Sequence, residues 1–183
     1  IMKVGIIRYP GSNCDIETSR YFSDLGEIFY IWHTEENLQL LHNLKLLILP
    51  GGFAFGDRVY DSATGEHQIS PGTMAINSPV SKLIMEATKL NIAILGICNG
   101  FQILTQMNLL PGKLVLNDCE TFVCKKKKIN VIYYEPPYKV ELYVANSYGK
   151  YIYGDRDFDE NSDYKPFLKY DDGSIAGVCN LKV

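Results

Sequence analysis

The chain of 183 residues is long enough to form one α/β domain with a full hydrophobic core. Its composition, 46% hydrophobic and 21% charged with a formal net charge of −3, gives no general electrostatic case for binding nucleic acid or an anionic membrane. No apolar run approaches the roughly 18 residues of a membrane-spanning helix, and no signal peptide is expected because Met2–Ile7 already has the pattern of a first strand.

Up to about residue 107, apolar runs without alternation are separated by helical patterns. We expect strands over Val4–Ile7, Ile28–Trp32, Leu44–Leu49 and Ile92–Ile97, and helices over Cys14–Leu25, Ser78–Leu90 and Gly100–Met107. Unalternated apolar strands between helices indicate a central, mostly parallel sheet buried on both faces. Functional sites in such sheets lie beyond the carboxyl ends of the strands.

After Pro111 the pattern changes to that of a small antiparallel sheet. The expected strands are Lys113–Leu116, Thr121–Cys124, Ile129–Tyr134, Val140–Ala145 and Ile175–Asn180. The basic run Lys125–Lys128 is interpreted as a solvated strand edge, with a phosphate or partner contact as the alternative. Asp155–Asp163 is interpreted as a solvated loop. No repeat or second domain is visible, so we predict a single domain over residues 1–183.

The cysteines are odd in number and scattered along the chain. The five are Cys14, Cys98, Cys119, Cys124 and Cys179. This pattern favours a reducing cytoplasm over a disulfide framework. No CxxC pair occurs and the histidines do not group with the cysteines, so we expect no metal site.

Cys98 has the most informative surroundings in the chain. The apolar run Ile92–Ile97 ends at this cysteine, and a helical pattern follows at once. This is the sequence form of a nucleophile elbow, a tight strand-to-helix turn that needs small residues nearby, here Gly96 and Gly100. The helix N-terminus would favour the thiolate and lower the pKa of the thiol. A buried, inert cysteine at a strand end is the alternative.

A second loop rich in glycine follows the strand Leu44–Leu49. Its sequence, Pro50-Gly-Gly-Phe-Ala-Phe-Gly-Asp57, exposes backbone N–H donors after a buried strand. One donor from this loop and one from Asn99 could form an oxyanion hole for a tetrahedral intermediate. Pro-Gly-Gly by itself marks any turn, and only the combination with Cys98 is specific.

These loops resemble those of the class I (triad) glutamine amidotransferases. The matching segments are Gly96–Gln102, Pro50–Asp57 and Tyr9–Asp15, and together they are most similar to the glutaminase subunits of phosphoribosylformylglycinamidine synthase. The resemblance covers about residues 2–180 and implies a flavodoxin-like fold. Asp57–Pro79 departs from the family pattern and is interpreted as an insertion over the rim of the active site.

The resemblance implies that Cys98 is the nucleophile that attacks the carboxamide of glutamine. Backbone N–H groups of Gly52 and Asn99 would hold the oxyanion, and a glutamyl thioester would then be hydrolysed. The residues expected to bind glutamine are Gly51, Phe53, Gln102 and Asn146. For Gln102 an exposed polar position on a helix is the alternative. Asn146 lies where the family has a histidine, so at this position the chain departs from the family pattern.

The resemblance also implies partners. The family passes ammonia to a large synthetase subunit that uses ATP and magnesium, and a small third subunit often bridges the two. No GxxxxGK[ST] motif occurs here, so ATP is assigned to the partner and no cofactor to this chain.

The catalytic His and Glu of the family belong to a His-Pro-Glu motif after the strand that here is Ser174–Asn180. Val183 ends the chain without that motif, and His33, His42 and His67 have no matching context. We therefore expect the gene product to be longer and the polypeptide as given to be inactive; a protein that truly lacks the dyad is the alternative. A DJ-1/PfpI-like hydrolase and a non-catalytic docking module remain competing functions.

Overall fold

The computed structural model describes residues 1–56, 70–154, 158 and 162–180. The chain forms two compact units, one up to Met107 and one from Asn108 onward. Within the described ranges, no helix is long and apolar enough to cross a membrane. Residues 57–69, which include His67 and most of the expected insertion, lie outside the described residues, as does most of the expected loop over residues 155–163.

The first unit contains the predicted parallel sheet. Its strands are β1 (Met2–Arg8), β2 (Gly26–Trp32), β3 (Leu44–Leu49) and β4 (Ala93–Gly96), in the order β2-β1-β3-β4. All three pairings are parallel. The chain leaves β1 toward β2 and leaves β3 toward β4, so the order reverses between β1 and β3. This is the switch point of a flavodoxin-like sheet, and ligands of such sheets bind beyond the carboxyl ends of the strands beside it.

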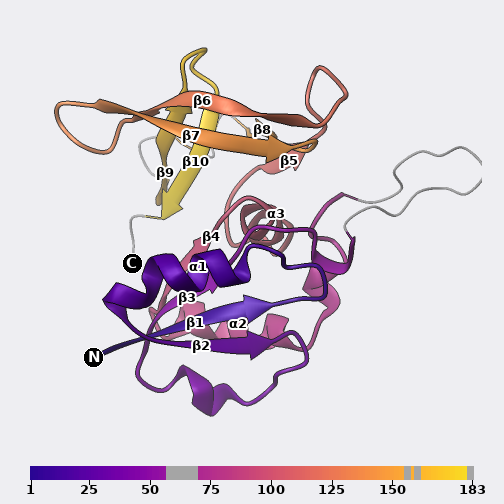
Figure 1. Cartoon of the computed structure of the whole chain (residues 1–183), viewed down its shortest axis with the longest axis vertical. Coiled ribbons are helices and arrows are strands. Elements are labelled where there is room, and N and C mark those ends of the chain that lie inside the picture. The colour runs from indigo at the N-terminus through magenta and orange to yellow at the C-terminus, as the bar shows by residue number, and fades with distance from the viewer. Residues whose placement is uncertain (57–69, 155–157, 159–161, 181–183) are drawn as a thin grey trace, which may run out of the picture. The chain divides into compact units, whose positions relative to one another are not determined.

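Two α-helices connect strands of this sheet, and a third follows its last strand, β4. They are α1 (Asp15–Phe22), α2 (Val80–Lys89) and α3 (Asn99–Gln106), with short 3₁₀ turns at Ser23–Leu25, Leu38–Leu41, Ala54–Gly56 and Ala75–Asn77. Figure 1 shows α1 in front of the strands and α2 behind them, as right-handed crossovers in opposite directions require. The side chains of Ile6, Leu47 and Ile48 are fully buried between these layers. The sheet is therefore covered on both faces, as the continuous apolar runs predict.

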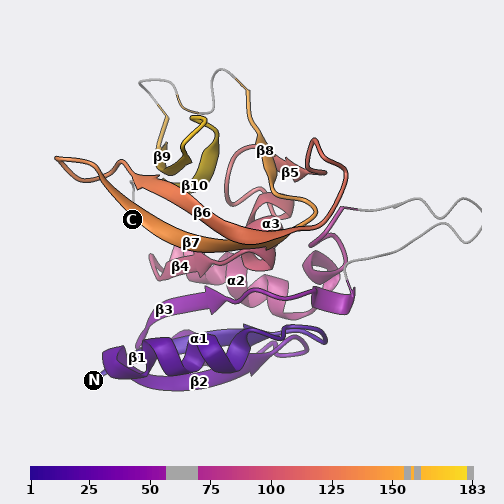
Figure 2. The same cartoon turned by 45° about the horizontal axis from the view of Figure 1, so that its top comes forward.

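The second unit consists of antiparallel strands, shown in Figure 2. A four-stranded sheet has the order β10-β9-β6-β7, and β5 pairs with β8 in a separate ladder. The strands are β5 (Lys113–Val115), β6 (Val123–Val131), β7 (Tyr138–Asn146), β8 (Lys150–Ile152), β9 (Tyr164–Tyr170) and β10 (Ile175–Asn180). The strand β8 was not predicted.

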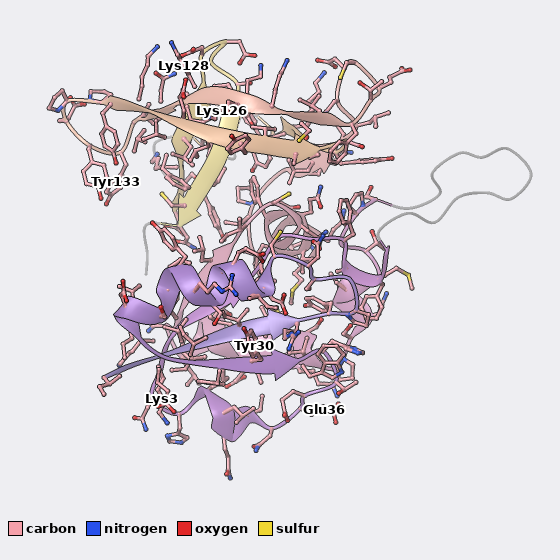
Figure 3. The ribbon with its side chains drawn as sticks, in the orientation of Figure 1. Lys3, Tyr30, Glu36, Lys126, Lys128 and Tyr133 are labelled. Atoms are coloured by element: carbon pink, nitrogen blue, oxygen red, sulfur yellow. The ribbon has the colours of Figure 1, made fainter. Side chains whose placement is uncertain are left out.

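The prediction of separate strands over Thr121–Cys124 and Ile129–Tyr134 is wrong, because β6 continues through the lysine run between them. Its partner β7 pairs with it along its whole length, from Val123 to Val131. The strand β9 pairs only with the last part of β6, from Ile129 onward. Among the described residues, the lysines therefore have a strand on one side only, and all but the half-buried Lys127 are exposed. The expected solvated edge is confirmed; Figure 3 labels two of its lysines.

Candidate active site

The backbone at Cys98 has the conformation of a nucleophile elbow. Cys98 lies between β4 and α3 with φ 51° and ψ −105°, outside the regions that L-residues normally occupy. Such a conformation costs on the order of 1–3 kcal/mol and persists only where the surrounding structure enforces it. Cys98 is solvent-exposed rather than buried. The alternative of a buried, inert cysteine is therefore wrong.

The surroundings of the elbow explain the two glycines that flank it. A Cβ on Gly100 would lie 1.9 Å from the carbonyl oxygen of Leu49, and a Cβ on Gly96 would lie 2.7 Å from the carbonyl oxygen of Gly100. Neither distance is compatible with a side chain. The requirement for small residues near Cys98, expected from the sequence, is therefore confirmed, and its cause is the close approach of α3 to β3 and β4.

The segment Pro50–Gly56, called the glycine loop below, lies against Cys98. A Cβ built on Gly51 would be 3.5 Å from Cβ of Cys98 and 3.5 Å from Sγ of Cys14. Gly52 has φ +143°, and a Cβ there would lie 2.7 Å from the carbonyl oxygen of Gly11. The loops after β1, β3 and β4 thus meet at one place, at the carboxyl ends of three neighbouring strands.

Backbone hydrogen bonds join the glycine loop to the loop after β1. Phe53 N donates to the carbonyl of Gly11 at 2.9 Å, and Cys14 N donates to the carbonyl of Gly51 at 3.3 Å. Within the described part of the chain, the N–H of Gly52 has no acceptor. A fixed, unused N–H donor one residue from the Gly51–Cys98 contact is what stabilisation of an oxyanion requires.

The next two candidate residues are buried together at the start of α3. The side chain of Asn99 is 2% exposed, and its Nδ2 donates to Oε1 of Gln102 at 3.0 Å. Oδ1 of Asn99 accepts from Ala54 N at 3.1 Å. Gln102 is 8% exposed, so its reading as an exposed helical residue is wrong.

Sequence reasoning missed Ala54, whose part in the site rests on its backbone N–H alone. Phe53 is exposed at the surface of the loop.

The loop after β1 differs from expectation in how α1 begins. The helix was expected from Cys14 but begins at Asp15; the capping position is Cys14, and no side chain caps it. Asp15 is instead buried, with Oδ2 2.5 Å from Nε of Arg8. Burial raises the pKa of the Cys14 thiol, and the negative charges of Glu17 and Asp15 raise it further. The proximity of Cys14 to the site was not predicted, although its segment was among the three that matched.

Asn146 lies in the second unit, at the end of β7. Nδ2 of Asn117 donates to the backbone carbonyl of Asn146 at 3.0 Å and to its Oδ1 at 3.3 Å. Gly149 N donates to Oδ1 of Asn117 at 3.0 Å. Asn146 therefore helps to form the turn between β7 and β8. Its contact with glutamine stays a prediction.

The two histidines that the structure describes, His33 and His42, lie in local packing and turn positions. His33 N donates to the carbonyl of Arg8 at 2.9 Å, and its ring contacts Phe55 edge-on with 5.2 Å between centroids. His42 ends a 3₁₀ turn. Across the described residues, no group of three or more His, Cys, Asp and Glu side chains could hold a metal ion. The site is thus a thiol beside backbone donors.

Comparison with known families agrees with this geometry. The profile of the CobB/CobQ-like glutamine amidotransferase domain matches residues 1–151. The phosphoribosylformylglycinamidine synthase subunit PurQ of Helicobacter hepaticus is 32% identical over 99% of this chain and 83% of its own length. The PurQ subunit of Alkaliphilus metalliredigens is 33% identical over 98% of this chain and 81% of its own length.

The chain belongs to the PurQ family of glutamine amidotransferases.

Solved structures agree with membership of the PurQ family. A chain in the structure of PurLQS from Thermotoga maritima superposes with a TM-score of 0.80 at 30% identity, over 97% of this chain and 81% of that one. Another glutamine amidotransferase from Thermotoga maritima superposes with a TM-score of 0.61 at 17% identity, over 99% of this chain and 72% of that one. The second likeness concerns the fold alone, and the PurQ fold is thus the class I amidotransferase fold expected from the sequence.

Proposed function

We propose that this chain is the glutaminase subunit of phosphoribosylformylglycinamidine synthase, which releases ammonia from glutamine for purine biosynthesis. The observation that carries the proposal is the elbow at Cys98, with φ 51° and ψ −105°, beside the glycine loop. Membership of a glutamine amidotransferase family indicates that the group attacked by Cys98 is a carboxamide. The relatives are PurQ subunits of phosphoribosylformylglycinamidine synthase, and this supports that synthase reaction as the one that uses the ammonia.

In the proposed mechanism, the thiolate of Cys98 attacks the side-chain carbonyl carbon of glutamine. The carbonyl oxygen becomes an oxyanion, which accepts hydrogen bonds from the N–H groups of Gly52 and Asn99. The C–N bond then breaks, the nitrogen takes up a proton and leaves as ammonia, and a glutamyl thioester remains on Cys98. Water attacks the thioester and gives glutamate and the free thiol. The sum is glutamine plus water to glutamate plus ammonia.

Three features of the structure support the proposed roles of Cys98 as nucleophile and of the backbone N–H groups as oxyanion donors. The exposed thiol is accessible to a substrate. The N–H of Gly52, which has no acceptor among the described residues, lies in the loop beside Cys98. Cys98 directly precedes α3, whose N-terminal partial positive charge favours a thiolate. We assign the remaining contacts to the α-amino and α-carboxyl groups of glutamine to Gly51, Phe53, Gln102 and Asn146.

Departure of ammonia needs a general acid as well as a nucleophile. No histidine in residues 1–183 is followed by Pro-Glu, the form of the dyad in the family. We therefore expect the polypeptide of residues 1–183, assayed by itself, to form the nucleophilic half of the site and to turn over glutamine poorly.

Ammonia released into water is protonated, and the ammonium ion is no nucleophile. We propose that the chain delivers it directly to a large synthetase partner, with a small third subunit in the assembly. The structure of PurLQS from Thermotoga maritima, one chain of which matches this chain, supports such an assembly. Thioester chemistry needs no metal or cofactor, so ATP and magnesium are assigned to the synthetase.

The test uses the complete gene product co-purified with its synthetase partners. Glutamine-dependent formation of glutamate and of the amidine product should both be lost in Cys98→Ala. Amidine formation from added ammonium salt should remain, because the synthetase does not need Cys98. The Cys124→Ala variant, which removes an exposed thiol on β6 instead, is the matched control and should keep glutamine-dependent activity.

Two outcomes would contradict the proposal. Glutaminase activity that survives in Cys98→Ala would remove the nucleophile from the mechanism. A wild-type complex that makes the amidine from ammonium salt but not from glutamine would indicate the docking module instead. A glutamine-mimetic diazo-ketone gives a second readout, because it should alkylate Cys98 and leave Cys124 unmodified.

A further inference from the structure

We propose that the side chain of Asn99 is a positioning group that holds the glycine loop against α3 and so sets the distance between the two oxyanion donors. The inference rests on the proposed function, because it concerns the same oxyanion. It goes beyond that function in giving the carboxamide of Asn99 a role separate from that of its backbone N–H.

The carboxamide of Asn99 is used at both ends. Its Oδ1 accepts from Ala54 N at 3.1 Å and its Nδ2 donates to Oε1 of Gln102 at 3.0 Å, and both hydrogen bonds are buried. Because the partner at Ala54 is an N–H, the group that faces it must be the oxygen, and this fixes the orientation of the carboxamide. Its Nδ2 is thereby directed to Gln102. Asn99 is among the largest side chains that are fully buried.

The bond to Ala54 joins the two elements that carry the oxyanion donors. The N–H of Gly52 belongs to the glycine loop, whereas the backbone N–H of Asn99 belongs to α3. Ala54 is two residues beyond Gly52 in the same loop. Donors stabilise an oxyanion only when each is about 2.7–3.1 Å from it, so the spacing between loop and helix must be held to a few tenths of an ångström.

Other bonds from the loop hold it in a different direction. Phe53 N and Phe55 N donate to the carbonyls of Gly11 and Pro10, and both acceptors lie after β1. These bonds fix the glycine loop relative to β1. The Ala54–Asn99 bond fixes it relative to the helix that begins directly after Cys98. The two sets of bonds together define the position of the Gly52 donor.

The chemistry of the position accounts for asparagine. A leucine would fill the same volume but would leave the N–H of Ala54 buried without an acceptor. An aspartate would keep the acceptor for Ala54, and Gln102 could turn its amide to donate to the second carboxylate oxygen. That carboxylate would also add a negative charge beside Cys98, which raises the pKa of a thiol.

The experiment compares wild type, Asn99→Leu, Asn99→Ala and Asn99→Asp in the complete synthase complex. Glutaminase kcat and KM report on the reaction. Alkylation of Cys98 by iodoacetamide reports on the thiol alone, because displacement of iodide forms no oxyanion. Amide hydrogen exchange of Ala54 reports on the bond itself and needs neither turnover nor any variant.

We expect kcat to fall by roughly 10- to 100-fold in Asn99→Leu and Asn99→Ala, since one donor is misplaced rather than removed. The rate of alkylation should stay within about twofold of wild type, and the Ala54 amide should exchange faster; KM should change less than kcat, although Asn99 also holds the side chain of Gln102. In Asn99→Asp the exchange of Ala54 should stay slow, while the pH profile of kcat moves to higher pH. In wild type, the Ala54 amide should exchange more slowly than that of Gly52.

Several results would overturn the proposal. Wild-type kcat in Asn99→Leu and Asn99→Ala would do so, as would a loss confined to KM. Fast exchange of Ala54 in wild type would show that the bond is not maintained in solution. If the wild-type complex releases no glutamate, the proposed function fails, while the exchange of Ala54 still decides whether the positioning bond exists.

Discussion

The carbonyl oxygen of Leu49 occupies the space that a side chain at Gly100 would need. A Cβ there would lie 1.9 Å from this oxygen and 2.8 Å from Cβ of Leu49. The same carbonyl accepts a hydrogen bond from Ile97 N at 3.0 Å, so it is not free to move away. The end of β3 thereby holds both sides of the elbow, the residue before Cys98 and the second residue after it.

Gly100→Ala should therefore destabilise the protein, against the usual rule for helices. Alanine in place of glycine normally stabilises a helix by about 0.5–1 kcal/mol. Here the overlap with Leu49 should outweigh that gain, and we expect a net loss of about 1–3 kcal/mol, as for overpacked cores. Denaturant unfolding measures the change. Gly173→Ala is the control, because among the described residues no atom beyond its chain neighbours lies within 4 Å of its Cβ position, and only its φ of +86° is unfavourable. A smaller loss at Gly100 than at Gly173 would contradict the expectation.

Replacement of Cys98 by glycine should give a more stable protein than replacement by alanine. The elbow conformation is strained for any residue with a Cβ but is readily adopted by glycine. Cys98→Gly should be about 1 kcal/mol more stable than Cys98→Ala, after the larger backbone entropy of glycine in the unfolded chain is subtracted. Urea midpoints of the two inactive variants measure the difference. Equal midpoints would show that the strain is relaxed in solution.

Cys14 and Cys119 should differ in their rates of alkylation, and the difference should depend on pH. Burial, with added repulsion from Glu17 and Asp15, raises the pKa of Cys14, whereas hydrogen bonds with Thr121 lower the pKa of Cys119. Because the thiolate is the reactive form, Cys119 should be alkylated faster than Cys14 at neutral pH. The ratio of their rates should narrow as the pH rises, since Cys14 ionises later. Mass spectrometry of peptides after timed alkylation gives both rates, and a faster Cys14 at neutral pH would refute the ranking.

Tyr9→Phe should stabilise the protein. The hydroxyl of Tyr9 is buried and has no hydrogen-bond partner within the described residues. Its removal relieves an unsatisfied polar group, and we expect a gain of about 1 kcal/mol in the free energy of unfolding. Thermal and denaturant unfolding would show it. A loss of stability would instead indicate a partner for the hydroxyl in solution.

The same substitution should change the alkaline limit of stability. Burial raises the pKa of Tyr9 in the folded protein well above its value in the unfolded chain, about 10. Above that pH the unfolded chain loses the proton while the folded protein keeps it, so ionisation favours unfolding and stability declines. The Tyr9→Phe variant lacks this contribution. Its lead over wild type should therefore widen above about pH 10.

The parts of the fold that were predictable from the sequence are those fixed by burial. The strands β1 and β3 are continuous apolar runs because helices cover both faces of the sheet. The elbow at Cys98 was predictable because Gly96 and Gly100 leave a local signal on both sides of the nucleophile.

The features that the sequence did not reveal depend on partners distant in the chain. The sequence indicated two strands where the structure has the single strand β6, which is continuous because β7 pairs with it along its whole length. Asp15 has the position of a helix cap in the sequence, but its carboxylate forms an ion pair with Arg8 instead. Oδ1 of Asn99 accepts from a backbone N–H, which any residue except proline provides. The residue type at position 54 therefore could not predict this hydrogen bond.

The bond between Ala54 and Asn99 joins positions separated by 45 residues in the chain. It can close only when β3 and β4 are aligned and α3 is docked on them. A molecule in which α3 detaches would keep most of its secondary structure but would have no assembled oxyanion hole. The free energy of that local opening, rather than of global unfolding, would set the fraction of competent molecules. Loss of glutaminase activity on warming should therefore precede loss of the far-ultraviolet circular dichroism signal.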